Sequence, residues 1–248
     1  MLSQDPLIKV RMIKQINFKG GTIIDGFPSA GLANAIASQC FNYSLKTELV
    51  AVLDSQAFPA MSVIHDTVPN FPARIYINDS LKLAIFTSEL NLDQSNHYDI
   101  AKIILQWAVE NECELIISAA GISSSETEDD IKQNEPDVYA VASTELARSK
   151  LVSLGIPQLP NGSITGIPAL LLNESRWINL DVVVLLVKVL RDTPDFRAAA
   201  ALSETIIKLV PGATCDINSL LKEAELVEKN LKKIRLLQQT NPDMDLYR

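Results

Sequence analysis

A glycine-bounded hexapeptide, Gly-Phe-Pro-Ser-Ala-Gly, follows an apolar run and has the residue types of a loop that could bind phosphate or hold a nucleophile. A Walker A loop needs a lysine directly after its last glycine, where this chain has Leu32. A dinucleotide loop needs a glycine in place of Pro28, and a nucleophile elbow needs one in place of Phe27. We therefore predict that Gly26, Pro28 and Gly31 form a structural turn, with an anion or nucleophile site as the alternative.

Other candidate reacting groups are sparse. His65 and His97 are the two histidines, and neither stands in the spacing of a triad or a metal site. Ser118 and Gly121 end a predicted strand, at the place where open α/β sheets bind ligands. The alternative function is thus an enzyme of small-molecule metabolism, of phosphorylase or hydrolase type, with its cleft near Gly26, Ser118 and Gly121. We assign no catalytic residue, no metal ligand and no cofactor.

Strand-like and helix-like runs alternate along the chain, which predicts an α/β fold with a mainly parallel sheet covered by helices. Several predicted strands are continuously apolar, as expected for strands buried on both faces. The predicted strands are residues 22–25, 48–54, 82–88, 114–119, 137–142 and 181–188. The predicted helices are residues 30–43, 97–111, 144–154, 195–209 and 218–239.

The last predicted helix carries a narrow apolar seam. Its members are spaced three and four residues apart, as in a coiled coil: Ile217, Leu220, Ala224, Val227, Leu231 and Ile234. Such a seam packs either on a partner helix or on its own domain, and the sequence leaves both open. Residues 58–72, rich in proline, and the acidic residues 123–137 are predicted to be long loops.

Composition narrows the class of protein. The 248 residues carry 22 Lys and Arg against 30 Asp and Glu, a formal charge of −8, which disfavours nucleic acid and anionic membranes as partners. No apolar run has the ~20 residues of a membrane-spanning helix, and the first residues do not resemble a signal peptide. We expect a cytoplasmic protein in which Cys40, Cys113 and Cys215 are reduced and mostly buried.

Five stretches, taken in order, resemble the proteasome assembly chaperone 2 family. They are GFPSAGLA, FPAMSVIHDTVPNFPARIY, WAVENECELIISAAGI, NGSITGIPALLL and DFRAAAALSETIIKLV. The resemblance runs from about Gly20 to Ile234 and implies a three-layer α/β/α sandwich similar to nucleoside phosphorylases, without their catalytic groups. It also implies binding to the proteasome core particle. On this basis we divide the chain into an α/β core domain (1–212), a C-terminal helix (213–239) and a flexible tail (240–248).

The last three residues resemble the HbYX tail of the family's archaeal activator-like members. Leu246 is the hydrophobic residue, Tyr247 the tyrosine and Arg248 the variable last residue. The resemblance implies an ATP-independent chaperone or activator whose tail docks on the α-ring. We expect a homo-oligomer, from trimer to pentamer, because several tails on one assembly bind a ring with avidity. Assembly chaperoning and gate opening are not separated by the sequence.

Overall fold

The central element of the fold is an eight-stranded sheet. The computed structural model describes residues 8–90, 92–123, 138–189 and 193–226. Within them the strand order is β1-β3-β6-β7-β2-β8-β10-β9, and β4 and β5 form a separate hairpin. The strands are β1 (Ile8–Met12), β2 (Thr22–Gly26), β3 (Glu48–Ser55), β4 (Val63–His65), β5 (Val68–Asn70), β6 (Ala73–Asn78), β7 (Leu83–Ser88), β8 (Leu115–Ser123), β9 (Val138–Ala142) and β10 (Asp181–Val189).

The middle of the sheet is parallel. Strand β2 lies between β7 and β8, and β8 pairs with β10, all in parallel register. The antiparallel strands β6 and β9 flank this block, and β3 and β1 extend one side further. Five of the eight strands, β3, β7, β2, β8 and β10, therefore run in one direction. The central strands are buried on both faces, which explains their continuous apolar sequences.

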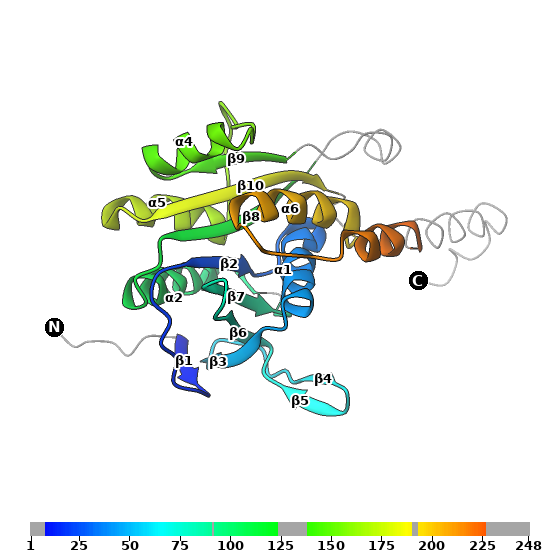
Figure 1. Cartoon of the computed structure of the whole chain (residues 1–248). Helices are drawn as coiled ribbons and strands as arrows, with labels where there is room; N and C mark the ends of the chain where they lie inside the picture. The colour runs from blue at the N-terminus through cyan, green and yellow to red at the C-terminus, as the bar shows by residue number, and fades with distance from the viewer. Residues whose placement is uncertain (1–7, 91, 124–137, 190–192, 227–248) are drawn as a thin grey trace, which may run out of the picture.

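Helices cover both faces of the sheet and complete three layers (Figure 1). Helices α1, α4 and α6 pack on one face around a core that includes Phe41, Leu151 and Leu202. Helices α2 and α5 pack on the other face, around a core that includes Ile104 and Leu171. The helices are η1 (Ala30–Leu32), α1 (Ala33–Ser44), η2 (Gln94–Asn96), α2 (His97–Glu110), α4 (Glu145–Ser153), α5 (Ile167–Ile178) and α6 (Phe196–Leu209). The predicted α/β/α sandwich is confirmed.

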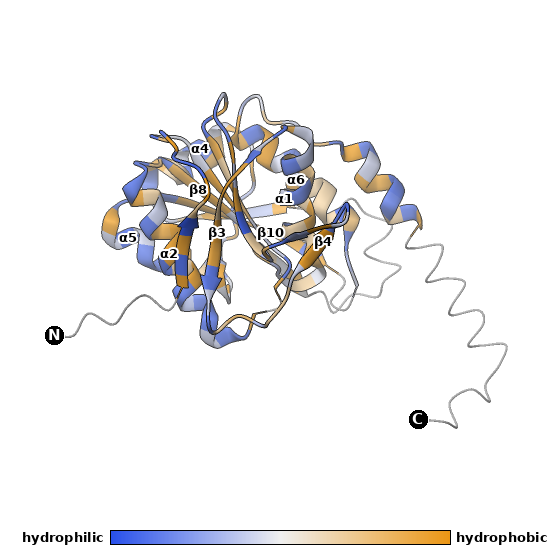
Figure 2. Ribbon diagram, turned by 90° about the horizontal axis from the view of Figure 1, so that it is seen from below, coloured by the Kyte–Doolittle hydropathy of each residue, from blue (hydrophilic) through white to orange (hydrophobic). Residues whose placement is uncertain are grey.

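Aromatic residues anchor the core on the α2 side. The ring of Trp107 lies 5.6 Å from that of Phe86 in an edge-on arrangement and 5.2 Å from that of Phe18. Such pairs stabilise a core beyond the area they bury. In Figure 2 the hydrophobic residues concentrate on the central strands and on the inward faces of the helices.

Four strands and one helix were not among the elements predicted from the sequence. Residues 58–72 are not all loop, because β4 and β5 form a hairpin that projects from the sheet (Figure 1). Its two turn residues, Asp66 and Thr67, have φ angles of 48° and 66°, as turns of the tight hairpin type require. Strands β1 and β6 and helix α5 were not predicted. The acidic loop was predicted at 123–137; its first residue ends β8, and residues 124–137 lie outside the described residues.

The C-terminal part is described as far as residue 226. Residues 217–226 are helical and follow an extended linker from α6. We call residues 213–226 the base segment. Ala213, Leu220 and Ala224 are buried, with exposed fractions of 3%, 8% and 4%, and Ile217 packs partly on the core of α1 and α6. In this part of the seam the apolar residues therefore face their own domain, while Val227, Leu231 and Ile234 lie outside the described residues.

Candidate functional site

A small pocket lies at the carboxyl ends of β2 and β8, where the predicted turn meets the start of α5. Its volume is about 180 Å³. Its lining combines two acidic or basic side chains with small and apolar ones: Asp25, Phe27, Pro28, Ser29, Ala30, His97, Ala119, Ala120, Gly121, Thr165, Gly166, Ile167 and Pro168. We call it the strand-end pocket. Its position matches the place where open α/β sheets bind ligands.

The turn at this pocket depends on glycine for two different reasons. A Cβ atom on Gly26 would lie 2.2 Å from Ser38 Oγ and 2.4 Å from the carbonyl oxygen of Phe86, so there is no space for one. Gly31 has a φ of 68° inside η1, a conformation that costs other residues energy, and its carbonyl accepts a hydrogen bond from Asp195 N. Pro28 lines the strand-end pocket. These observations favour the structural interpretation of the turn.

The end of β8 comes equally close to the turn. A Cβ atom on Gly121 would lie 2.5 Å from the carbonyl oxygen of Ala30. Gly121 thus allows the strand to pass against the start of η1, and the strand-end pocket is correspondingly narrow. The sequence analysis placed Gly26, Ser118 and Gly121 near one cleft. In the structure Gly121 lines the strand-end pocket with His97, whereas Gly26 and the buried Ser118 lie behind its lining. His65 lies elsewhere, on the β4–β5 hairpin, with its ring edge-on to Tyr43 at 6.4 Å.

A buried carboxyl group is the feature of this region that sequence reasoning missed. Asp25 is 1% exposed. Ser118 Oγ donates a hydrogen bond to Asp25 Oδ2 at 2.6 Å, and the Phe27 amide donates to Asp25 Oδ1 at 3.0 Å. The signal was an acidic residue at the end of an otherwise apolar strand, because a buried charge needs partners. Asp25 ties β8 to the first residues of the turn.

Burial sets the protonation of Asp25. Loss of water raises the pKa of this carboxyl from 3.8 to about 6, and the hydrogen bonds from Ser118 and Phe27, which favour the charged form, oppose the rise only in part. Between about pH 4 and 6 the folded protein therefore holds a proton that the unfolded chain has lost. This group makes its greatest contribution to the free energy of unfolding below pH 4, and that contribution is lost as the pH rises through 6.

Asp25→Asn should remove this pH dependence. The amide keeps the size of the carboxyl group and carries no charge. The stability of the variant relative to the wild type should therefore increase as the pH rises. We expect the difference in unfolding free energy to grow by about 2–3 kcal/mol between pH 4 and pH 7. Urea denaturation of both proteins across this range measures it, and other titrating groups cancel in the difference. A difference that stays constant with pH would contradict the assignment.

The described residues hold no cluster of three or more potential metal ligands. Nor does any helix among them have the length and apolar character needed to cross a membrane. The sites predicted to bind the proteasome, Leu246, Tyr247 and Arg248, lie outside the described residues. What the structure does describe is the base segment that precedes them.

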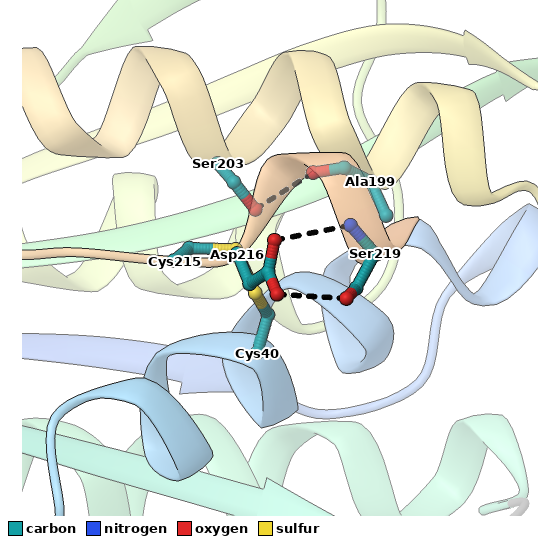
Figure 3. The surroundings of a disulfide bond; sticks show 6 residues. All are labelled: Cys40, Ala199, Ser203, Cys215, Asp216 and Ser219. Carbon is teal, nitrogen blue, oxygen red and sulfur yellow. Dashed lines mark hydrogen bonds between the residues drawn. A yellow bond between two sulfur atoms is a disulfide. The ribbon is translucent and has the colours of Figure 1, made fainter. Parts of the chain in front are cut away.

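The cysteine prediction was wrong for two of the three residues. Cys40 on α1 and Cys215 in the base segment form a disulfide, with their Cα atoms 5.4 Å apart (Figure 3). Cys113 is free and buried, and its burial raises the pKa of its thiol to about 12. The two bonded residues are 175 positions apart in the sequence, and their meeting depends on the packing of the linker after α6 against α1. Spacing alone could not reveal that contact.

An apolar groove of about 740 Å³ runs beside the disulfide. We call it the α1 groove. One wall is α1, and the other is formed by the start of α6 and the base segment. The residues that line the whole groove are Pro28, Leu32, Ala35, Ile36, Gln39, Cys40, Tyr43, Ser44, Ser88, Glu89, Phe196, Asp216, Ser219 and Leu220. Leu32 and Tyr43 are 41% and 67% exposed. The base segment thus contributes part of one wall of this apolar groove.

Known structures resemble the whole fold. The chain is similar to PbaA of Pyrococcus furiosus, described as an archaeal homolog of proteasome-assembly chaperone, with 29% identity, a TM-score of 0.79 and 95% of this chain and 99% of that chain covered. PbaB of the same organism, described as an archaeal proteasome activator, has 22% identity and a TM-score of 0.78 over 93% of this chain and 100% of its own. At that identity the likeness shows the fold alone.

A PAC2 family protein of Streptomyces avermitilis shares the fold as well, with 17% identity and a TM-score of 0.64 over 87% of this chain and 95% of its own. No curated protein sequence matches this chain significantly. The model of the PAC2 family, in contrast, matches residues 23–235. That match takes in the sheet apart from β1, both helix layers and the base segment, and by it the chain belongs to the PAC2 family.

Proposed function

We propose that this protein is an ATP-independent proteasome assembly chaperone or activator that docks its C-terminal tail on the α-ring of the proteasome core particle. The observation that carries the proposal is the likeness to PbaA, at 29% identity over 99% of the length of that chain. Membership of the PAC2 family points the same way. ATP independence rests on the turn, where Leu32 takes the place of the lysine that reaches the phosphates.

The chemistry of the last three residues suits a docking tail. Leu246 can fill a small apolar pocket, and Tyr247 combines a rigid ring with a hydroxyl group. The carboxylate of Arg248, at the end of the sequence, can pair with a lysine side chain between two subunits of a ring. Each group is small, so one tail alone binds weakly, and several tails on one assembly bind tightly.

A homo-oligomer, from trimer to pentamer, is therefore part of the proposal. Each chain has a mass of 27.2 kDa, so light scattering of the purified protein at micromolar concentration should give three to five times that mass. We expect an oligomer because several tails bind the ring together, which raises their effective concentration there and can increase avidity by ~10²–10⁴. A mass of about one chain would contradict this part of the proposal and leave single-tail docking to be tested.

The proposal is tested directly with purified core particle. A pull-down measures binding, and hydrolysis of a short fluorogenic peptide in the same samples measures gate opening. Binding with faster hydrolysis indicates an activator, and binding without it indicates an assembly chaperone. Absence of binding by the full chain at micromolar concentration would overturn the proposal.

The enzyme alternative draws on the strand-end pocket, which holds a buried carboxyl group and His97. The Ser118 hydroxyl, which does not line the pocket, donates to Asp25, and this buried carboxyl group thereby connects β8 to the turn. A metabolite bound at the strand ends in a ligand soak would favour the alternative.

A further inference from the structure

We propose that the Cys40–Cys215 disulfide is a redox latch, which holds the base segment on α1 when oxidised and lets it detach when a dithiol reduces it. The proposal goes beyond the proposed function and does not depend on it. It rests on three features of the described residues: the position of the bond, the small apolar contacts that otherwise hold the base segment, and the partial exposure of the two cysteines.

The bond joins two elements that are distant in sequence. Cys40 belongs to the last turns of α1, and Cys215 precedes the helical residues 217–226 by two positions (Figure 3). Both cysteines also border the α1 groove or its wall, since Cys40 and the neighbouring Asp216 line it. The covalent link therefore fixes the base segment at its first residues, close to where it leaves the linker.

The described noncovalent contacts of the base segment with the domain come mainly from small or partly buried apolar side chains. Ala213, Leu220 and Ala224 are buried, and Ile217 and Leu221 pack partly on the core. Asp216 accepts hydrogen bonds from the amide and the hydroxyl of Ser219, at 3.1 and 2.7 Å, and both bonds stay within the segment. Most helical stability in proteins comes from the packing of an apolar face, so the segment depends on its attachment to the domain. The disulfide adds a covalent anchor to these apolar contacts.

The two cysteines of the latch are more accessible for exchange than the third cysteine. Cys40 and Cys215 are both partly exposed, and Cys40 faces the open α1 groove. Cys113 is 7% exposed, beneath the end of α2. Exposed disulfides are the ones that exchange readily, whereas a buried thiol is protected.

Reduction is a two-electron exchange with a dithiol. One thiolate of the dithiol attacks a sulfur of the bond and forms a mixed disulfide, and one protein thiolate leaves and takes up a proton. The second thiolate of the dithiol then displaces the other protein sulfur. The products are two protein thiols, at Cys40 and Cys215, and the dithiol in its cyclic disulfide form.

Release changes the surface as well as the segment. Asp216, Ser219 and Leu220 form part of one wall of the α1 groove. When the base segment detaches, this wall is lost, and the apolar face of α1 around Leu32, Ile36 and Tyr43 becomes more open. The latch thus controls both the anchoring of the C-terminal segment and the accessibility of the groove.

The test follows free thiols and amide hydrogen exchange in the full chain, with and without dithiothreitol. Before reduction one thiol per chain, that of Cys113, should react under denaturing conditions, and after reduction all three. Amides of residues 217–226 should exchange at least ~10-fold faster after reduction, as expected for a locally opened segment, while those of α6 stay protected. Exchange that is equal in both states would overturn the proposal, as would three free thiols in the protein purified under air.

Variants separate the latch from general effects of the reductant. In Cys215→Ser, the amides of residues 217–226 should exchange as fast as in the reduced protein, whether or not dithiothreitol is present. Cys40→Ser, which removes the other half of the bond, should behave in the same way. Cys113→Ala keeps the latch and should respond to dithiothreitol like the wild type. A Cys215→Ser protein that protects residues 217–226 as well as the oxidised wild type would contradict the proposal. None of these readouts requires the proteasome, so they succeed or fail apart from the proposed function.

Discussion

Removal of Leu246–Arg248 should abolish binding to the core particle while the fold and the oligomeric state stay intact. The three residues follow Pro242 at the end of the last predicted helix, so their loss should change stability by no more than about 0.5 kcal/mol. A buried tyrosine anchor contributes about 2–4 kcal/mol, which corresponds to a ~30- to 1,000-fold loss of affinity at each tail. Tyr247→Ala should therefore do nearly as much harm as the truncation, measured by pull-down and by peptide hydrolysis.

Two further variants make this experiment specific for the tail chemistry. One residue added after Arg248 displaces the carboxylate and leaves Leu246 and Tyr247 unchanged, so it should also weaken binding severely. Arg248→Lys keeps the carboxylate at a position that tolerates any residue, and it should bind like the wild type. If the truncated chain binds and stimulates hydrolysis as well as the full one, the tail has no role and the enzyme alternative regains weight.

Gly26→Ala should cost about 3 kcal/mol of unfolding free energy, a large effect for one methyl group. The new Cβ would lie 2.2 Å from Ser38 Oγ and 2.4 Å from the Phe86 carbonyl oxygen, between α1 and β7. Backbone atoms on one side and a packed helix on the other cannot both move without loss of contacts in the core. Urea denaturation at neutral pH measures the change.

Gly155→Ala is the matched control for this prediction. Gly155 has a φ of 66°, and a Cβ atom there would meet nothing within 4 Å. Its substitution carries only the conformational cost of a left-handed residue, about 1 kcal/mol. Equal losses at the two positions would show that space at Gly26 is not the reason for its glycine, and the structural interpretation of the turn would then fail.

Some elements were predictable from sequence because their environment matches their composition. The central strands β2, β7, β8 and β10 are mostly apolar, since helices cover both of their faces. Strand β1 alternates apolar and polar residues over five positions at the edge of the sheet, and such a short pattern does not stand out. Strand β6 contains Arg74, which can be buried because it pairs with Glu89. The charged residue makes this buried strand hard to identify from its composition.

Helix α5 had a signal that was overlooked. Pro168 stands in its first turn, where proline is favoured because its missing amide would have no partner in the helix. The candidate site was less accessible to sequence reasoning. Asp25 and Ser118 are 93 residues apart, and Cys40 and Cys215 are 175 apart. Both contacts are created by the order of strands and the packing of helices, which no local pattern encodes.

The disulfide also determines how the protein bears tension. A pull on the C-terminal end, such as a docked tail transmits, reaches Cys215 and passes through the covalent bond to Cys40 on α1. The two cysteines are 175 positions apart, and the residues between them carry none of this load while the bond is closed. Stretched between its two ends, the oxidised chain is shorter than the reduced one by up to ~600 Å, the contour of that bypassed loop. A pulling force therefore does not act on the elements within this loop unless the bond is reduced. These elements include β3, β6, β7, β8, β10 and α6.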